Sequence, residues 1–382
     1  MEEKQLLMIP GPTPVPPSVL LAGARPMVNH RGPEFAQALE ECTQGLKKVF
    51  QTEHHVFILT GSGTGGLEAA VVNMLSPGDL VLSVSIGVFG DRFASIAQAF
   101  GAKVESLNFE WGSAADPEKI RARLASDKKK EIKAVLITHN ETSTGVTNDL
   151  ATIGPIVREH GAVLLVDGIS SLVAIDCQTD KWCLDLVIAG SQKAFMIPPG
   201  LTFIAMNDRA WAAMEKAAIP RFYWDLGKAK DYLDRGQTPW TPAVPQVFQL
   251  HAALRLLEGE GMQACFARHA RQAAAVRAGV EALGLKLFAE PAGASSAVTS
   301  VRKPEGVAVG DLRKLMQGKY GVVLAGGQQK LRSEIFRIGH LGYVGESDII
   351  ATLGALGMGL KELGVEVDPC AGVTACINAL GG

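Results

Sequence analysis

Hydrophobic residues in the first two thirds of the chain gather in short runs that are apolar throughout, and amphipathic stretches separate these runs. A strand with one face in water alternates apolar and polar positions, whereas a parallel strand buried on both faces is apolar at every position. Such runs, alternating with helical periodicity, predict an α/β fold with a doubly wound, mostly parallel sheet. We expect strands over residues 56–60, 80–84, 134–138, 162–166 and 186–189.

The pattern changes near residue 258, where strand-like runs become fewer and helical stretches longer. A chain of 382 residues exceeds the size at which one hydrophobic core keeps growing, so a second domain is expected. The later segments indicate a smaller α+β domain. We therefore divide the chain into an N-terminal arm (1–22), a large domain (23–257), a small C-terminal domain (258–368) and a tail (369–382).

The arm contains the proline-rich stretch 9–17. Proline has no backbone N–H, so this stretch is predicted to run extended and to form neither a helix nor a central strand. It is either a docked arm or a segment in which Gly11 lets the backbone approach a ligand closely.

Composition narrows the classes of function. Hydrophobic residues make up 47%, charged residues 20%, and the formal net charge is −2, so no overall field favours nucleic acid or an anionic membrane. No apolar run is long enough to span a bilayer, and the first residues resemble neither a signal nor a transit peptide. The six cysteines lack C-x-x-C spacing, and the histidines lack partners at metal-ligand spacing. We expect a cytoplasmic protein with no metal, membrane or nucleic-acid partner.

The segment 60–66 is a glycine-rich loop between a predicted strand and a predicted helix. Free N–H groups at the start of a helix, together with the Ser62 and Thr64 hydroxyls, would form a cradle for phosphate. The loop also matches the dinucleotide fingerprint, but Asp79 precedes the following strand, and the fingerprint needs an acid at its end. A purely structural turn is the remaining alternative.

Three more charged groups follow predicted strands or lie within one. Asp167 closes the strand 162–166, Lys193 comes shortly after 186–189, and Arg337 lies inside an apolar strand. Each has an ordinary explanation: a helix cap for Asp167, a solvated surface position for Lys193, and a buried ion pair for Arg337. Ligands of open α/β sheets bind beyond the carboxyl ends of the strands, so these groups also outline one candidate site.

One cofactor uses all four features. Pyridoxal 5'-phosphate (PLP) requires a lysine amine for a Schiff base, an acid for its pyridine nitrogen, a phosphate cradle and a clamp for the substrate carboxylate. No G-x-S-x-G motif is present to indicate a serine hydrolase.

These residues resemble the class V (fold type I) PLP-dependent aminotransferases, most closely the alanine–glyoxylate and serine–glyoxylate group. The resemblance spans nearly the whole chain. It rests on Pro10-Gly-Pro-Thr-Pro14, Asn29-His-Arg31, Gly61-Ser-Gly-Thr64, Glu141-Thr-Ser-Thr-Gly145, Val166-Asp167, Gly190-Ser-Gln-Lys193 and Phe336-Arg-Ile-Gly-His-Leu-Gly342.

The resemblance implies a role for each matching residue. Lys193 would carry PLP and move the substrate α-proton, and Asp167 would pair with the pyridine nitrogen. Phe89 would stack on the ring, where many relatives have Trp, and Thr142 would reach the phenolic oxygen. The remaining implied contacts are Ser62, Gly63, Thr64 and Gln192 to the phosphate, and Arg337 and Gly11 to the substrate.

The resemblance also implies a homodimer with shared active sites. Thr238 and Thr241, in the segment 237–241, would contact the phosphate bound by the other subunit. Some relatives place Tyr near position 238. Arg31 is either a second cation for a dianionic substrate or a residue that packs or forms an ion pair in the N-terminal arm.

The predicted activity is therefore transfer of an amino group from alanine or serine to a 2-oxo acid such as glyoxylate. Aspartate or 2-aminoethylphosphonate as the donor is the alternative on the same fold. A different class is a non-catalytic or redox subunit built on this fold. Cysteine desulfurase is disfavoured, because the segment 325–333 before Arg337 contains no cysteine.

Overall fold

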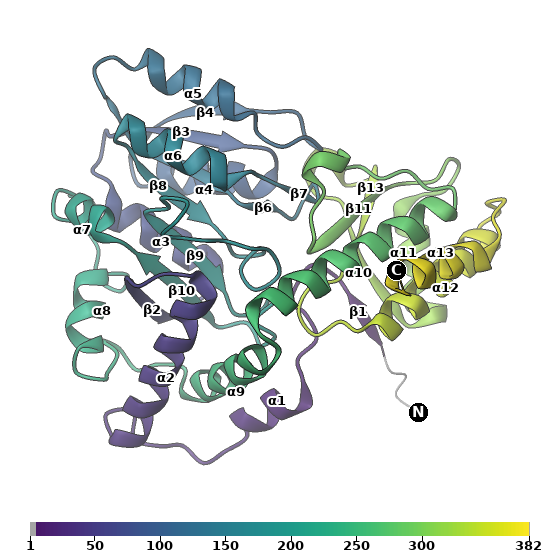
Figure 1. Ribbon diagram of the computed structural model, residues 1–382, viewed down its shortest axis with the longest axis horizontal. Coiled ribbons are helices and arrows are strands. Elements are labelled where there is room, and N and C mark those ends of the chain that lie inside the picture. Colours follow the sequence, from purple (N-terminus) through teal and green to yellow (C-terminus); the bar gives the residue numbers. More distant parts are fainter. Residues whose placement is uncertain (1–4, 382) are drawn as a thin grey trace.

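The computed structural model describes residues 5–381, so residues 1–4 of the expected arm and residue 382 of the expected tail lie outside the described residues (Figure 1). Its large sheet runs in the order β2-β10-β9-β8-β5-β3-β4. Strand β10 is antiparallel to both of its neighbours and the other pairs are parallel, which confirms a mostly parallel α/β sheet. The strands are β2 (His55–Thr60), β10 (Leu201–Met206), β9 (Leu186–Gly190), β8 (Val163–Asp167), β5 (Ile132–Thr138), β3 (Leu80–Ser85) and β4 (Lys103–Asn108).

Helices cover both faces of this sheet, which explains the continuous apolar runs. Within β5, Val135 and Ile137 belong to one core, and Ala134 and Leu136 belong to the core on the opposite face. The first core includes residues of α2 (Pro33–Phe50), α5 (Pro117–Ser126), α6 (Leu150–His160) and α9 (Val244–Glu260). The second includes residues of α3 (Gly63–Met74), α4 (Val88–Ala99), α7 (Asp208–Met214) and α8 (Leu226–Leu233).

A second sheet, in the order β1-β12-β13-β11, forms the smaller domain at the right of Figure 1. Its strands are β1 (Leu6–Met8), β12 (Val322–Gly326), β13 (Ile335–Gly339) and β11 (Val298–Arg302). Its helices are α10 (Met262–Ala282), α11 (Val309–Tyr320), α12 (Glu346–Glu362) and α13 (Pro369–Gly381), with short 3-10 turns at η1 (Pro291–Gly293) and η2 (Gln329–Leu331). A hairpin of β6 (Asn140–Glu141) and β7 (Val146–Thr147) extends from the large domain.

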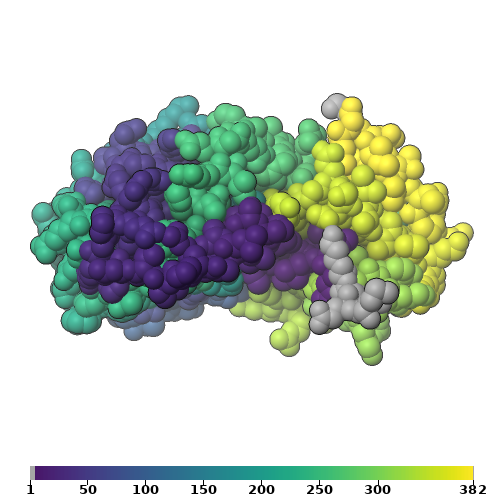
Figure 2. Space-filling view, turned by 90° about the horizontal axis from the view of Figure 1, so that it is seen from below, coloured from purple at the N-terminus to yellow at the C-terminus, as the bar shows by residue number. Residues whose placement is uncertain are grey.

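The N-terminal segment connects the two domains. Strand β1 pairs in parallel with β12 of the small sheet, and α1 (Pro17–Gly23) packs against α9. Figure 2 shows these first residues in purple, crossing from the large domain to the small one. Thr13 is only 4% exposed, so part of the segment is buried between its neighbours.

The segment expected to be a tail is helical in the structure. Helix α13 packs against α10 and α12, and its Cys376 is fully buried. Gly372 of α13 lies against Leu283, the residue that follows α10. Small residues at this contact let the helices approach closely. Among residues 5–381, the helices include none with the length and apolar character that crossing a bilayer would require.

Candidate active site

Lys193 lies in the turn after β9, at the carboxyl end of a strand in the large sheet. Its Nζ donates a hydrogen bond to the carbonyl oxygen of Pro10 at 2.8 Å. Burial lowers the pKa of the Lys193 amine from 10.5 to about 8, and the positive charge of Arg337 adds to this effect. An amine with a lowered pKa is available as a nucleophile near neutral pH.

The N-terminal segment is fastened to the same turn. Thr13 Oγ1 donates to the carbonyl oxygen of Lys193 at 2.8 Å, and the Thr13 N–H donates to that of Gln192 at 3.1 Å. Gly11 has φ +148°, and a Cβ there would lie 2.6 Å from Lys193 Nζ. The need for glycine at position 11 therefore comes from the approach of the backbone to the lysine.

Asp167 ends β8, the strand beside β9, and its side chain is buried. The Ile169 N–H donates to its Oδ1 at 3.0 Å. Burial raises the pKa of the Asp167 carboxyl to about 7, the backbone hydrogen bond and the positive charge of Lys193 oppose the rise, and the charge of Glu141 adds to it. A buried carboxylate with so little compensation is suited to a cationic partner such as a protonated ring nitrogen.

The glycine loop begins α3 immediately after β2, as the sequence pattern predicts. The Ser62 side chain makes no capping hydrogen bond, so the N–H groups of the first helical turn have no side-chain partner from it. Ser62 and Thr64 are exposed in the single chain. A Cβ at Gly63 would lie 2.6 Å from Ile169 Cδ1, which places this loop against the segment that follows Asp167.

Gln192 contributes a buried acceptor to this region. Its Oε1 is buried and has no hydrogen-bond partner among the residues that the structure describes. The Gln192 Oε1 and the Ile169 side chain both lie close to Gly190, since a Cβ added to this glycine would be 3.1 Å from the oxygen. An unsatisfied buried oxygen beside the lysine is costly, and a bound group with a donor would satisfy it.

Arg337 lies in β13 of the small domain and is 6% exposed. Its Nη1 donates to the Thr142 carbonyl oxygen at 3.0 Å, and its Nε donates to the Gly326 carbonyl oxygen at 2.9 Å. Within the described range, no carboxylate forms an ion pair with it, so the structure does not provide the buried pair that was one alternative. Burial lowers the pKa of the Arg337 guanidinium to about 10.

Thr142 follows the short strand β6, and its hydroxyl donates to Ser170 Oγ at 2.8 Å. Ser170 in turn donates to the Asn140 carbonyl oxygen at 2.8 Å. These bonds hold Thr142 against the loop after Asp167. Because Thr142 also accepts a hydrogen bond from Arg337, this one residue connects the small domain to the loop that follows β8. The resemblance pointed to Thr142 but not to Ser170.

Glu141 is a buried residue of this region to which the sequence analysis assigned no role. Its Oε2 accepts the N–H groups of Phe89 and Gly90, at 3.0 and 3.1 Å, and its Oε1 accepts the Ser143 N–H at 3.0 Å. Burial raises the pKa of the Glu141 carboxyl. The carboxylate thus fixes the start of α4, which carries Phe89. The sequence signal that could have pointed to this role is the presence of Glu141 itself in the motif Glu141-Thr-Ser-Thr-Gly145.

Arg92 stands one helical turn after Phe89, with its guanidinium carbon 4.7 Å from the centre of the Phe89 ring. Its positive charge lowers the pKa of both Lys193 and Asp167, behind larger causes for each. Arg92 is exposed in the single chain. It is therefore a cation near the candidate site that sequence analysis missed.

Thr238 and Thr241 are not brought to Lys193 by any contact within the described chain. The Thr238 hydroxyl donates to the Trp240 carbonyl oxygen at 2.8 Å. Arg31 reaches the same segment, because its Nη1 donates to Gln237 Oε1 at 2.7 Å and to the Thr238 carbonyl oxygen at 2.9 Å.

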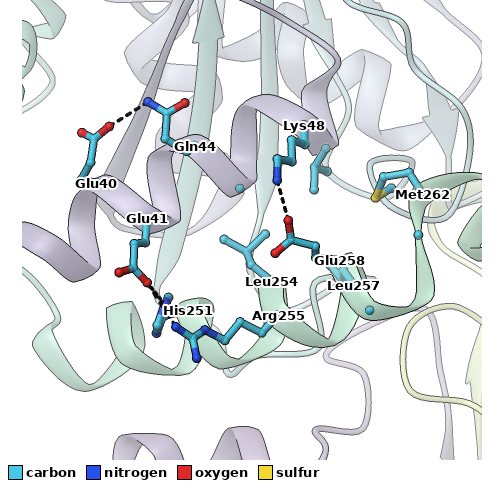
Figure 3. Close-up of a pocket in the computed structure, with 14 residues that line it drawn as sticks. Glu40, Glu41, Gln44, Lys48, His251, Leu254, Arg255, Leu257, Glu258 and Met262 are labelled. Carbon is cyan, nitrogen blue, oxygen red and sulfur yellow. Dashed lines mark hydrogen bonds and ion pairs between the residues drawn. The ribbon is translucent and has the colours of Figure 1, made fainter.

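A cavity of about 760 Å³ lies elsewhere, between α2 and α9. Figure 3 shows Glu41 directed toward His251 and Lys48 toward Glu258 across the space between the two helices. None of the predicted site residues lines it. Across residues 5–381, no cluster of three or more His, Cys, Asp or Glu side chains is placed to hold a metal ion.

Comparison with known proteins agrees with this arrangement at the strand ends. Residues 11–338 match the family model described as Aminotransferase class-V. The chain belongs to the class-V aminotransferases. The match begins at Gly11 and extends into β13, so it includes the glycine loop, Asp167, Lys193 and Arg337.

Named relatives of this chain differ in their described functions. It is 47% identical to the soluble hydrogenase 42 kDa subunit of Anabaena cylindrica, over 96% of each chain. It is 36% identical to an L-aspartate–glyoxylate aminotransferase of Paracoccus denitrificans, over 98% of this chain and 96% of the relative. It is 37% identical to a serine–glyoxylate aminotransferase of Methylorubrum extorquens, over 98% of this chain and 95% of the relative.

The solved structures place the chain in fold type I. Pyridoxamine–pyruvate aminotransferase from Mesorhizobium loti matches with a TM-score of 0.95 and 31% identity, over 99% of this chain and 98% of the other. The expected fold class and family are thus confirmed, with a mixed but mostly parallel large sheet and a smaller mixed sheet.

Proposed function

We propose that this protein is a PLP-dependent transaminase that moves an amino group from alanine or serine to a 2-oxo acid such as glyoxylate. The observation that carries the proposal is the grouping of three charges from separate elements. Lys193 has a lowered pKa, Asp167 has a raised pKa, and Arg337 lacks a carboxylate partner in the described chain.

The residues present fit PLP on structural grounds. The α3 start with Ser62, Gly63 and Thr64, together with the side-chain amide N–H groups of Gln192, would hold the phosphate. Asp167 would keep the ring nitrogen protonated, and Phe89, fixed through Glu141, would cover the ring. When bound, PLP supplies an electrophilic carbon for the amine and an electron sink for the α-carbon.

The other steps of the proposed reaction would be carried out by side chains of the protein. Lys193 would hold PLP and, once released by the incoming amine, take and return the proton at the substrate α-carbon. Its lowered pKa leaves a useful fraction of neutral amine near pH 8. Arg337 would bind the substrate carboxylate with donors other than the two already fixed by backbone carbonyls. Gly11 would leave room for the substrate beside the lysine.

The choice of donor rests on the relatives. The name serine–glyoxylate aminotransferase supports serine with glyoxylate, and the name L-aspartate–glyoxylate aminotransferase supports the alternative donor aspartate at similar identity. Both names contain glyoxylate, so the acceptor is better supported than the donor. A methyl, a hydroxyl and a carboxylate differ by few atoms, and discrimination among them depends on the contacts of the side-chain pocket.

A second candidate is an accessory subunit of a soluble hydrogenase, which the name of the Anabaena relative favours. Residues 5–381 include no cluster of metal-ligating side chains, so any such role would draw its metal ligands from a partner. The grouping of Lys193, Asp167 and Arg337 has no use in that role, and we therefore favour the transaminase.

A panel of half-reactions tests the proposal. PLP-loaded protein is mixed with alanine, serine, aspartate or 2-aminoethylphosphonate, and the absorbance of the lysine-bound cofactor is followed. Alanine or serine should react fastest, whereas a preference for aspartate or the phosphonate would select the alternative. The Lys193→Ala protein, as a control, should bind PLP only noncovalently and show no turnover. Wild-type protein that attaches PLP but responds to no donor would refute transamination.

A further inference from the structure

Arg31 is bonded to one segment of the large domain rather than to an acidic side chain. Its Nη1 donates to Gln237 Oε1 at 2.7 Å and to the Thr238 carbonyl oxygen at 2.9 Å, and its Nη2 reaches the Pro239 carbonyl oxygen at 3.5 Å. The guanidinium carbon lies 5.2 Å from the centre of the Tyr232 ring. Three successive residues of the segment are thus held by one side chain.

Arg31 is an exposed residue whose backbone is fixed just before α2. It precedes α2, whose first residue is Pro33, and the Arg31 N–H donates to Asn29 Oδ1 at 2.9 Å. Arg31 and Gln237 are in contact although they are 206 positions apart in the sequence. A planar guanidinium presents donors in a fixed fork, and this geometry suits several carbonyl oxygens at once, whereas an ammonium cannot reproduce it.

The same segment is tied at its other end to the glycine loop. Trp240 Nε1 donates to the Tyr223 carbonyl oxygen at 2.9 Å, and the Ala243 N–H donates to Thr60 Oγ1 at 3.1 Å. Thr60 is the last residue of β2, immediately before the loop. Arg31 therefore holds the first residues of this segment, Gln237 to Pro239, whereas other contacts fix its later residues.

We propose that Arg31 is a positioning residue that holds Thr238 in place for the cofactor phosphate of the partner subunit. The inference rests on the proposed function, since it requires PLP and a dimer with shared sites. It differs from both earlier alternatives for Arg31, because the terminal nitrogens are engaged by Gln237 and by two backbone oxygens of the large domain, and these are neither an acid nor part of the N-terminal arm.

The first test measures PLP affinity of the apoprotein, without any amino donor. Arg31→Ala and Arg31→Lys should each weaken PLP binding about tenfold, because Lys keeps the charge and loses the fork. Arg25→Ala is the matched control. It removes a nearby arginine that pairs with Glu34, and PLP affinity should stay unchanged. Native PLP affinity in both Arg31 variants would overturn the inference, and so would native affinity in Arg31→Lys alone.

The second test asks which subunit Arg31 serves. Arg31→Ala and Lys193→Ala chains carrying different tags are co-expressed, and the mixed dimer is purified through both tags. In the mixed dimer, the only intact Lys193 receives its phosphate contacts from the chain with intact Arg31. One site per dimer should therefore bind PLP covalently with native affinity.

The outcomes separate this inference from the proposed function. If the mixed dimer keeps the weakened affinity of the Arg31→Ala homodimer, Arg31 acts within its own subunit and the inference is wrong. A native-affinity site in the mixed dimer supports it and also shows that the Arg31→Ala chain is folded. If wild-type protein attaches no PLP to Lys193, the proposed function fails first, whatever Arg31 does.

Discussion

Arg337 Nη1 donates a hydrogen bond to the carbonyl oxygen of Thr142 at 3.0 Å, and this bond joins β13 of the small domain to the hairpin of the large one. A second bond, from Nε to the Gly326 carbonyl oxygen, fixes the plane of the guanidinium. Backbone oxygens orient the group without neutralising it. The charge therefore remains available for an anion that arrives between the domains.

Replacement of Arg337 by Lys should raise KM for the amino donor about 100-fold, because the proposed bidentate contact to the substrate carboxylate would be lost. The affinity for PLP should stay within about twofold of wild type. Steady-state kinetics and PLP titration check the two halves of the prediction. Arg313→Lys is a suitable control, since Arg313 Nε also donates to a strand carbonyl, that of Leu324, and should leave KM nearly unchanged. Equal effects in both variants would contradict the assignment.

The reactivity of Lys193 in the apoprotein should follow its lowered pKa. Burial, together with the charge of Arg337, lowers this pKa from 10.5 to about 8. Labelling of Lys193 by trinitrobenzenesulfonate, followed by peptide mass spectrometry, should be half-maximal near pH 8, because the neutral amine reacts. The Arg337→Met variant should move this midpoint upward. A wild-type midpoint near 10.5 would exclude an activated amine.

Asp167 should make the apoprotein less stable as the pH rises. Burial raises its pKa from 3.8 to about 7, so the folded state holds a proton that the unfolded state has released between these values. Stability from this group is complete below the unfolded pKa and is lost as the pH approaches the folded one. Between pH 5 and pH 8 the loss should be roughly 3 kcal/mol.

Urea unfolding of wild-type and Asp167→Asn apoproteins at the two pH values measures this difference. The Asn variant lacks the titrating group, so its stability should change less with pH. The same variant should bind PLP but transaminate at least about 1000-fold more slowly, because a neutral amide does not keep the ring nitrogen protonated. Identical pH slopes for both proteins would contradict the assigned pKa.

Gly11→Ala should disturb the site without disturbing the core. A Cβ at Gly11 would lie 2.6 Å from Lys193 Nζ, so either the N-terminal segment or the lysine must move. We expect kcat/KM to fall about tenfold or more while the melting temperature drops by only a few degrees. Gly284→Ala is a comparison at another positive φ with open space around it. Unchanged kcat/KM in Gly11→Ala would show that the approach to Lys193 is unimportant.

Periodicity was informative for most of the buried strands. It failed at an edge strand, at a three-residue strand and at β10, which is buried along its whole length. The apolar runs at 134–138 and 186–189 fall within β5 and β9. The apolar pattern does not reveal β4, an edge strand in which exposed Lys103 precedes a mixture of polar and apolar positions. Nor does it reveal β10, which follows a Pro-Pro-Gly turn and runs antiparallel to its neighbours. A three-residue strand such as β1 carries no periodicity at all.

The site was predictable as far as its motifs lay at strand ends. Lys193 and Asp167 could be grouped because the parallel strands β8 and β9 end at one edge of the large sheet. Arg337 lies within an antiparallel strand of the other sheet, and it was grouped with them only through the chemistry of the cofactor. Glu141 and Arg92 were missed because their importance depends on the start of α4, which no local pattern reveals. The contact between Arg31 and Gln237 joins residues 206 positions apart, and sequence alone offers no measure of that proximity.

The pairing of β1 with β12 has a consequence for synthesis of the chain. Leu6 leaves the ribosome early, whereas its partner Val322 follows more than 300 residues later. Until Val322 is available, β1 has no partner strand and the proline-rich stretch that follows β1 is not fixed at its N-terminal end. Pro10 and Gly11 are therefore not yet held next to Lys193. Nascent chains arrested before residue 322 should contain a folded large sheet and an unfinished lysine pocket. The cofactor would thus be captured only at the end of translation.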